Sequence, residues 1–268
     1  MSAPNRKAGL GAAALVLSTA ALSVAGQSAV TAAPDTSSTL SAAGNVGTTV
    51  TGAGQVAVDG DTKVDVGVVE TEGGEVRVAA GPDASLPRAW RFPSFAAAGL
   101  YPRAVLGVTP TTGEAMSPGA SDFAYGAVFR LDDSSSGRLV DDGDNVFQRG
   151  RYADTSMFKL QVDRGRPGCL VRGSAGRVLV TSSVEITPDR WYRAVCTRVG
   201  STLSVLVRPY GDVDATVVDR SDGPTGALSM PATRRASIGG KLTASGLQIV
   251  AASDQFNGAI AKVWVDRS

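Results

Sequence analysis

The sequence predicts an all-β fold, a sandwich or a barrel built from many short strands. Apolar runs of strand length recur along the chain, and turn-favouring residues separate them. After the N-terminal segment, no window shows helical periodicity. The 32 glycines fit the same interpretation, because many short strands need many turns. At 268 residues, we expect one large β domain rather than two small ones.

Residues 1–32 have the pattern of a secretory signal peptide. Arg6 and Lys7 precede an apolar stretch over residues 8–25, and small residues permit cleavage after Ala25 or at the end of the segment. The alternative is an uncleaved membrane anchor, which is disfavoured because the stretch is rich in Ala, Gly and Ser and short for a bilayer span. We therefore expect a secreted chain that makes no stable membrane insertion after cleavage.

Two segments precede the main domain. Residues 33–55 are mostly Ala, Ser, Thr, Gly and Val, and we expect a disordered linker because so little bulky apolar area cannot offset the entropy of ordering. Residues 56–88 contain alternating valines around Asp59-Gly60-Asp61 and Glu72-Gly73-Gly74-Glu75, which predicts short strands joined by hairpin turns. These strands either open the main domain, residues 89–268, or form a separate extension.

Within the main domain, residues 122–131 form the clearest predicted strand. Phe123, Tyr125 and Phe129 share one of its faces, and burying each such side chain stabilises a fold by roughly 1.5 to 3 kcal/mol. A β meander is predicted from four apolar runs at 158–162, 169–171, 178–181 and 191–197. Further strands are predicted at 89–95, 104–108, 202–208, 215–218, 236–240 and 256–265.

The order of five segments resembles a known family. They read DFAYGAVFRL, NVFQRGRYADTSMFKLQV, ITPDRWYRAVCTR with GSTLSVLV, SIGG and DQFNGAIAKVWV. Together they resemble the laminin G-like domains of the concanavalin A-like lectin/glucanase superfamily, especially the secreted actinobacterial type, over residues 89–266. The resemblance implies a jelly-roll β-sandwich of two antiparallel sheets and a non-catalytic, lectin-like module that binds a glycan or a surface protein. It departs from that family at Arg208-Pro209-Tyr210-Gly211, where an Asp-Gly turn is usual.

Cys169 and Cys196 are the only cysteines. An even count in an exported chain favours a disulfide, and both residues lie in the predicted meander, so we expect a bridge between neighbouring strands. The alternative is a pair of buried free thiols. A bridge would also make a thiol nucleophile unavailable.

Composition argues against most enzymes and against nucleic acid. Lys plus Arg, at 26, nearly balances Asp plus Glu, at 25, so no overall field attracts nucleic acid. Histidine is absent, which removes the commonest general base and metal ligand. The glucanase pattern Glu-x-Asp-x-x-Glu is also absent, and from residue 89 onward the only glutamates are Glu114 and Glu185. We expect no enzymatic activity, and a glycosidase of the same superfamily is the weaker alternative.

Tyrosines in or near turns are the candidate glycan-binding residues. Tyr101, Tyr152 and Tyr210 have this placement, and a tyrosine ring stacks on a sugar ring at little entropic cost. The alternative for each tyrosine is ordinary packing at the rim of the sandwich. Arg149 and Arg151 lie close to Tyr152 in sequence and either bind an acidic group or, as we expect, are solvated.

One acidic turn is a candidate calcium site. Asp141, Asp142 and Asp144 offer the carboxylate oxygens that Ca²⁺ prefers, but their spacing is not that of an EF-hand loop, and a solvated turn is the alternative. No other cofactor is expected. The rival to a glycan-binding module is a cell-envelope structural or interaction protein that binds only other proteins.

Overall fold

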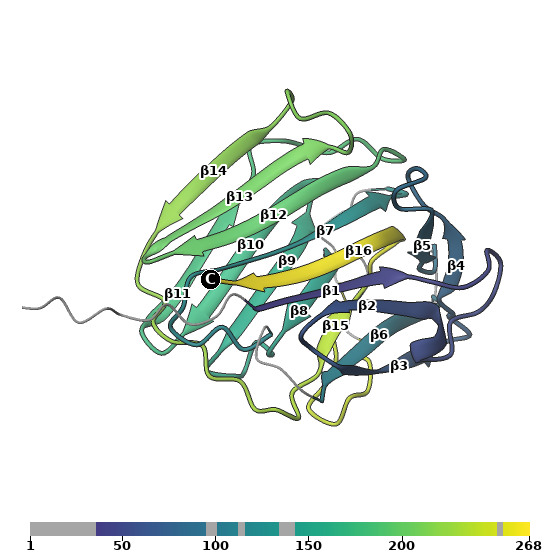
Figure 1. Cartoon of the computed structure of the whole chain (residues 1–268), viewed down its shortest axis with the longest axis horizontal. Coiled ribbons are helices and arrows are strands. Elements are labelled where there is room, and N and C mark those ends of the chain that lie inside the picture. The colour runs from purple at the N-terminus through teal and green to yellow at the C-terminus, as the bar shows by residue number, and fades with distance from the viewer. Residues whose placement is uncertain (1–35, 95–100, 112–115, 134–142, 251–253) are drawn as a thin grey trace, which may run out of the picture. The chain divides into compact units, whose positions relative to one another are not determined.

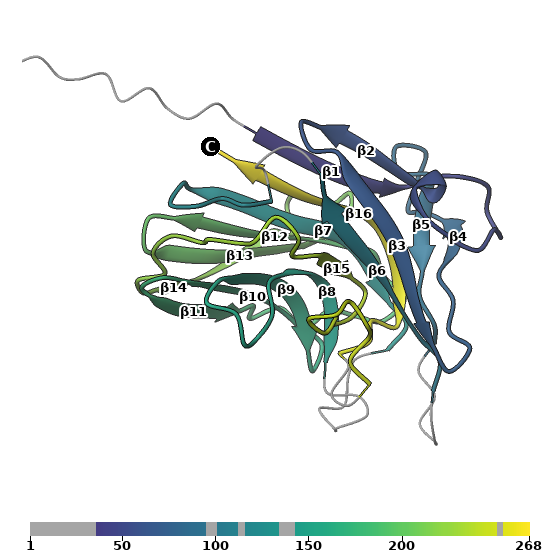
Figure 2. The same cartoon turned by 90° about the horizontal axis from the view of Figure 1, so that it is seen from below.

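The computed structural model describes residues 36–94, 101–111, 116–133, 143–250 and 254–268. These residues form two sheets that pack face to face, and every pairing between named strands is antiparallel (Figures 1 and 2). The all-β jelly-roll sandwich predicted from the sequence is confirmed. The predicted signal peptide, residues 1–32, lies outside the described residues.

One sheet has nine strands, ordered β14-β13-β12-β7-β16-β1-β2, and β5 pairs with both β16 and β4 beside this path. Its strands are β1 (Thr36–Ala42), β2 (Val56–Gly60), β4 (Arg77–Ala80), β5 (Arg88–Arg91), β7 (Phe123–Leu131), β12 (Tyr192–Val199), β13 (Thr202–Pro209), β14 (Val217–Asp222) and β16 (Gly258–Arg267). The described helical structure is one 3₁₀ turn, η1 (Ala53–Gln55). No helix among the described residues is long and apolar enough to span a membrane.

The other sheet has seven strands, ordered β11-β10-β9-β8-β15-β6-β3. They are β3 (Val64–Thr71), β6 (Arg103–Pro110), β8 (Asp144–Arg149), β9 (Met157–Asp163), β10 (Arg166–Gly173), β11 (Gly176–Thr181) and β15 (Ala236–Ile238). The predicted four-stranded meander is therefore wrong in its last strand. The run at 191–197 becomes β12 and enters the nine-stranded sheet, while β9, β10 and β11 remain a meander.

Both sheets contribute alternate residues to one core, as the sequence pattern predicts. On β7, Phe123, Tyr125 and Phe129 are buried, and on β9, Phe158 and Leu160 are buried. The Tyr125 hydroxyl crosses the core and donates a hydrogen bond to the backbone carbonyl of Leu170, at 3.0 Å. Burial raises the pKa of this phenol, so the group stays protonated and can keep donating.

A disulfide joins Cys169 of β10 to Cys196 of β12, with Cα atoms 5.6 Å apart. The predicted pairing is confirmed, but the predicted placement between neighbouring strands is wrong, because β10 and β12 lie in opposite sheets. The bridge therefore crosses the core and ties the two layers of the sandwich together.

The described segments between residues 36 and 88 belong to the sandwich. Residues 33–55 were expected to be a disordered linker, but β1 lies in this range and pairs with β16 and β2, with Leu40 fully buried. The backbone ladder of a sheet needs little side-chain bulk, so the composition of this segment does not prevent a strand. Residues 56–88 also join the fold, because β2 extends the nine-stranded sheet and β3 extends the seven-stranded one.

Candidate functional site

A row of side chains crosses the outer face of the seven-stranded sheet. Gln148 of β8 pairs with Lys159 of β9, Lys159 pairs with Leu170 of β10, and Leu170 pairs with Leu179 of β11. Side chains alternate along a strand, and the neighbours of Lys159 on β9 point into the core, so this row points away from the core.

A groove of about 400 Å³ lies over this row. Its floor is the sheet, and its sides come from the turn between β8 and β9 and from the chain between β15 and β16. Its lining residues are Gln148, Arg151, Tyr152, Met157, Lys159, Gln161, Asp163, Leu170, Arg177, Leu179, Lys241, Leu242, Ile249 and Asp254. The groove thus combines an apolar strip with four cationic and two anionic side chains.

An ion cluster fastens one side of the groove to the sheet. Asp254 accepts from Lys159 Nζ at 2.5 Å through Oδ2 and from Lys241 Nζ at 2.9 Å through Oδ1. Burial raises the pKa of Asp254, but the two lysines more than offset this effect, so the pKa lies below its ordinary value. The Asp254 carboxylate is therefore ionised and fixed in position.

A second carboxylate, Asp163, lies at the end of β9 in the same groove. It accepts a hydrogen bond from Gln161 Nε2. Burial raises the pKa of Asp163, the negative charge of Asp254 raises it further, and the two lysines oppose both effects. The groove therefore holds two carboxylates whose pKa values are shifted in opposite directions.

Tyr152 stands at the edge of the groove, and the residue is 72% exposed. The Arg172 guanidinium lies 4.9 Å from the ring centroid, and its Nη1 donates to the Tyr152 carbonyl. Asp154 closes the same turn by accepting from the Arg151 backbone N at 2.9 Å and from its Nη2 at 2.7 Å. Gly150 begins the turn at φ +81°, where a Cβ would lie 2.3 Å from the Ser156 carbonyl oxygen. An exposed ring is thus held on an ordered turn.

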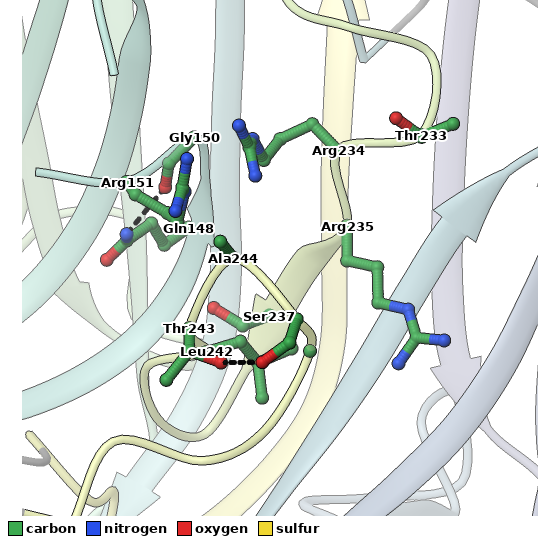
Figure 3. Close-up of a pocket in the computed structure, with 12 residues that line it drawn as sticks. Gln148, Gly150, Arg151, Thr233, Arg234, Arg235, Ser237, Leu242, Thr243 and Ala244 are labelled. Carbon is green, nitrogen blue, oxygen red and sulfur yellow. Dashed lines mark hydrogen bonds between the residues drawn. The ribbon is translucent and has the colours of Figure 1, made fainter. Parts of the chain in front are cut away.

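A smaller cavity of about 110 Å³ adjoins the groove and shares Gln148, Arg151 and Leu242 with it (Figure 3). Arg151 and Arg234 approach each other from opposite sides, and Asp154 pairs with both guanidinium groups. Gln148 Nε2 donates to the Gly150 carbonyl at 2.6 Å across the cavity wall. The cavity therefore extends the polar edge of the groove.

The three candidate tyrosines have different outcomes. Tyr152 lies on the groove. Tyr101 is 2% exposed beneath the Arg103 guanidinium, so its prediction as a stacking ring is wrong. Tyr210 lies on the outer face of the opposite sheet, where it packs beside Trp191 and its hydroxyl lies 3.0 Å from Ser85 Oγ. Its ring therefore belongs to a different surface from that of Tyr152.

The structure describes only one of the three candidate calcium ligands, so the predicted site stays a prediction. Asp141 and Asp142 lie outside the described residues. Asp144 is buried in β8, where its Oδ1 accepts from the Asn257 backbone N at 3.2 Å. In the described part of the chain, no group of three or more Asp, Glu, Cys or His side chains is placed to hold a metal ion.

The residues that complete the groove were not predictable from the sequence. Lys159 and Gln161 were recognisable as the polar face of a strand, but nothing in the local sequence links them to Lys241 or Asp254. The pair Lys159 and Asp254 is separated by 95 positions, and only the sheet topology brings the two together.

No protein-family model matches this chain, and neither does any curated protein. Solved structures that match include a protein of unknown function from Shewanella oneidensis MR-1, at 10% identity and a TM-score of 0.46, over 75% of this chain and 78% of that one. Domain 4 of AbnA, a GH43 extracellular arabinanase from Geobacillus stearothermophilus solved in complex with arabinotriose, matches at 12% identity and a TM-score of 0.48, over 76% and 82%. Domains LG4-5 of the mouse laminin α1 chain match at 13% identity and a TM-score of 0.41, over 56% of this chain and 37% of that one. Similarity this low carries no argument about a ligand.

Proposed function

We propose that this protein is an exported, non-catalytic recognition module that binds a glycan in the groove on the outer face of the seven-stranded sheet. The observation that carries the proposal is the exposed ring of Tyr152, held by Arg172 at the edge of a groove with an apolar strip and fixed polar groups. Export is supported by the Cys169–Cys196 disulfide, by the pattern of residues 1–32 and by the resemblance to secreted actinobacterial laminin G-like domains.

The groove offers both kinds of contact that a sugar needs. A pyranose has an apolar face and a rim of hydroxyls, so it stacks on an aromatic ring while its hydroxyls bind charged or amide side chains. The Tyr152 ring and the Leu170–Leu179 strip supply the apolar contact. Lys241, Gln161 and the exposed Arg177 supply hydrogen-bond donors along the same groove. An excess of cationic over anionic side chains favours a glycan with acidic substituents.

Glycan-array binding with three proteins tests this proposal. The wild type is expected to bind a defined set of oligosaccharides, enriched in acidic ones, and Tyr152→Ala is expected to lose at least tenfold in affinity. Tyr210→Ala is the matched control, because it also removes a tyrosine ring, but from the opposite sheet. This variant is expected to bind like the wild type. An array without wild-type binding would instead favour the rival function, a cell-envelope protein with only protein partners.

A glycosidase is the second candidate, because the groove holds two carboxylates with oppositely shifted pKa values, as paired acid and base groups have. Against it, Asp254 is held between two lysines and its side chain is only 9% exposed, which keeps its oxygens from a sugar carbon. Incubating the protein with each bound oligosaccharide decides between the candidates. Release of reducing ends that is lost in Asp163→Asn would establish the enzyme, and intact oligosaccharide supports the non-catalytic module.

A further inference from the structure

Arg149 is a buried cation at the end of β8. The residue is 2% exposed. Its neighbours across the sheet, Phe158 and Ala236, both point into the core, so Arg149 also points inward rather than into the outer groove. The expectation that this arginine is solvated is therefore wrong.

The guanidinium group lacks a counter-ion among the described residues. Nη1 donates to Ser117 Oγ at 3.0 Å, and Nε has no hydrogen-bond partner. No described carboxylate forms an ion pair with Arg149. Burial alone lowers the pKa of Arg149 to about 10, so the group remains charged at neutral pH. A buried charge without a counter-ion is strongly destabilising, so a ligand that supplied the counter-ion would remove that cost.

Arg149 lines a cavity of about 520 Å³ that is separate from the groove. The cavity has apolar walls from Pro110, Leu228 and Met230 and hydroxyl groups from Thr111 and Ser117. A small organic molecule needs a pocket of this size, mostly apolar with a few fixed polar groups.

Hydrogen bonds hold the walls of this cavity in place. The Leu228 backbone N donates to the Gly119 carbonyl at 2.8 Å. Arg198 reaches from β12 in the opposite sheet and donates to the Gly226 carbonyl at 2.9 Å and to the Ser121 carbonyl. The Ser229 backbone N donates to Ser156 Oγ at 2.9 Å. The cavity is thus formed before any ligand arrives.

We propose that this cavity is a binding site for a carboxylate group carried on a small apolar body. The Arg149 guanidinium would donate to the two carboxylate oxygens through its Nη–H groups, at the end of the side chain that reaches Ser117 on the cavity wall. The Ser117 hydroxyl lies beside the guanidinium group, and the apolar walls of the cavity would cover the body of the ligand. The carboxylate belongs either to a free organic acid or to the C-terminus of a peptide.

Titration of the wild-type protein tests the site, followed through the Arg149 Nε–Hε signal in ¹H–¹⁵N NMR spectra and the thermal midpoint. Benzoate represents a free acid and N-acetylleucine a peptide C-terminus; their amides, benzamide and N-acetylleucinamide, are the neutral controls. We expect saturable shifts and a raised midpoint with at least one acid and none with its amide. Which acid binds identifies the source of the carboxylate. Absence of saturable binding by both acids, or equal binding by acid and amide, overturns the proposal.

Two variants of Arg149 locate the binding. Arg149→Met removes the charge at similar volume and is expected to abolish acid binding without lowering the midpoint. Arg149→Lys keeps the charge but loses the fork, and is expected to bind at least tenfold more weakly. Unchanged binding in Arg149→Met would overturn the proposal, and if that variant fails to fold, the wild-type titration still decides. Tyr152→Ala is expected to bind the acids normally, because Tyr152 does not line this cavity. A negative result at the cavity therefore leaves the proposal of glycan binding in the groove untouched, and the reverse also holds.

A double-mutant cycle tests whether a carboxylate of this chain, that of Glu114, pairs with Arg149. Glu114 lies outside the described residues and three positions before Ser117 in sequence. We expect Glu114→Gln to change the thermal midpoint equally in the wild-type and Arg149→Met backgrounds. A midpoint loss seen only with Arg149 present would show that Glu114 pairs with Arg149, and would overturn the proposal.

Discussion

Lys159 and Asp254 form an ion pair, with Nζ and Oδ2 2.5 Å apart, between β9 and the segment that precedes β16. The pair holds that segment against the outer face of the seven-stranded sheet, and Lys241 adds a second bond to the same carboxylate. Because both partners line the groove, this contact shapes the proposed binding surface as well as stabilising the fold.

Asp254→Asn is predicted to lower the free energy of unfolding at pH 7 by about 3 kcal/mol, because two mostly buried lysines lose their counter-ion. The folded-state pKa of Asp254 lies below the ordinary 3.8, so its contribution is present above pH 3.8 and is lost as the pH falls through the folded-state value. Urea unfolding at several pH values is the measurement. The gap between wild type and variant is expected to shrink in acid, and a gap that stays constant from pH 7 to pH 3 would contradict the ion pair.

Asp163→Asn is predicted to act in the opposite direction. Burial raises the pKa of Asp163 above 3.8, so the folded state binds more protons than the unfolded state just above that pH, and wild-type stability falls as the pH rises through this window. Removing the charge is therefore expected to raise the free energy of unfolding at pH 7 and to have little effect below pH 3.8. The same urea series measures it, and a loss of stability at pH 7 would contradict this account of Asp163.

The disulfide closes a loop of 27 residues, and the length of this loop sets how much the bridge stabilises the fold. The double variant Cys169→Ser, Cys196→Ser is expected to lose about 3 to 4 kcal/mol of unfolding free energy, because the unfolded chain regains the entropy of an open loop. Guanidinium unfolding of the wild type with and without reductant, beside the double variant, measures this loss. Equal stability of oxidised and reduced wild type would contradict a stabilising bridge between the sheets.

Local sequence patterns predicted most strands, but not which sheet each strand enters. The alternation of Phe158, Leu160 and Val162 correctly indicated the inward face of β9. The turn at Thr187-Pro188-Asp189 looks like a hairpin turn, yet the chain crosses to the other sheet there, and no local residue signals the crossing. Composition likewise predicted disorder where β1 forms, because the place of β1 depends on backbone hydrogen bonds to β16 and β2.

The candidate site was predicted only in part, for a related reason. Residues next to Tyr152 indicate a turn, so the exposure of its ring was predictable from the local sequence. Tyr101 carries similar turn signals but is buried by tertiary packing beneath Arg103. The inward direction of Arg149 follows from the register of β8 with β9, which no single segment of sequence determines.

The place where the glycan binds can be measured by an NMR titration of the ¹⁵N-labelled protein with its strongest glycan-array ligand. Binding in the groove is expected to give saturable shifts of the backbone signals of Tyr152, Arg177 and Leu179, which line the groove, and none around Tyr210 on the opposite sheet. Shifts confined to the Tyr210 surface, with the groove signals unchanged, would contradict the assignment of the groove as the binding site.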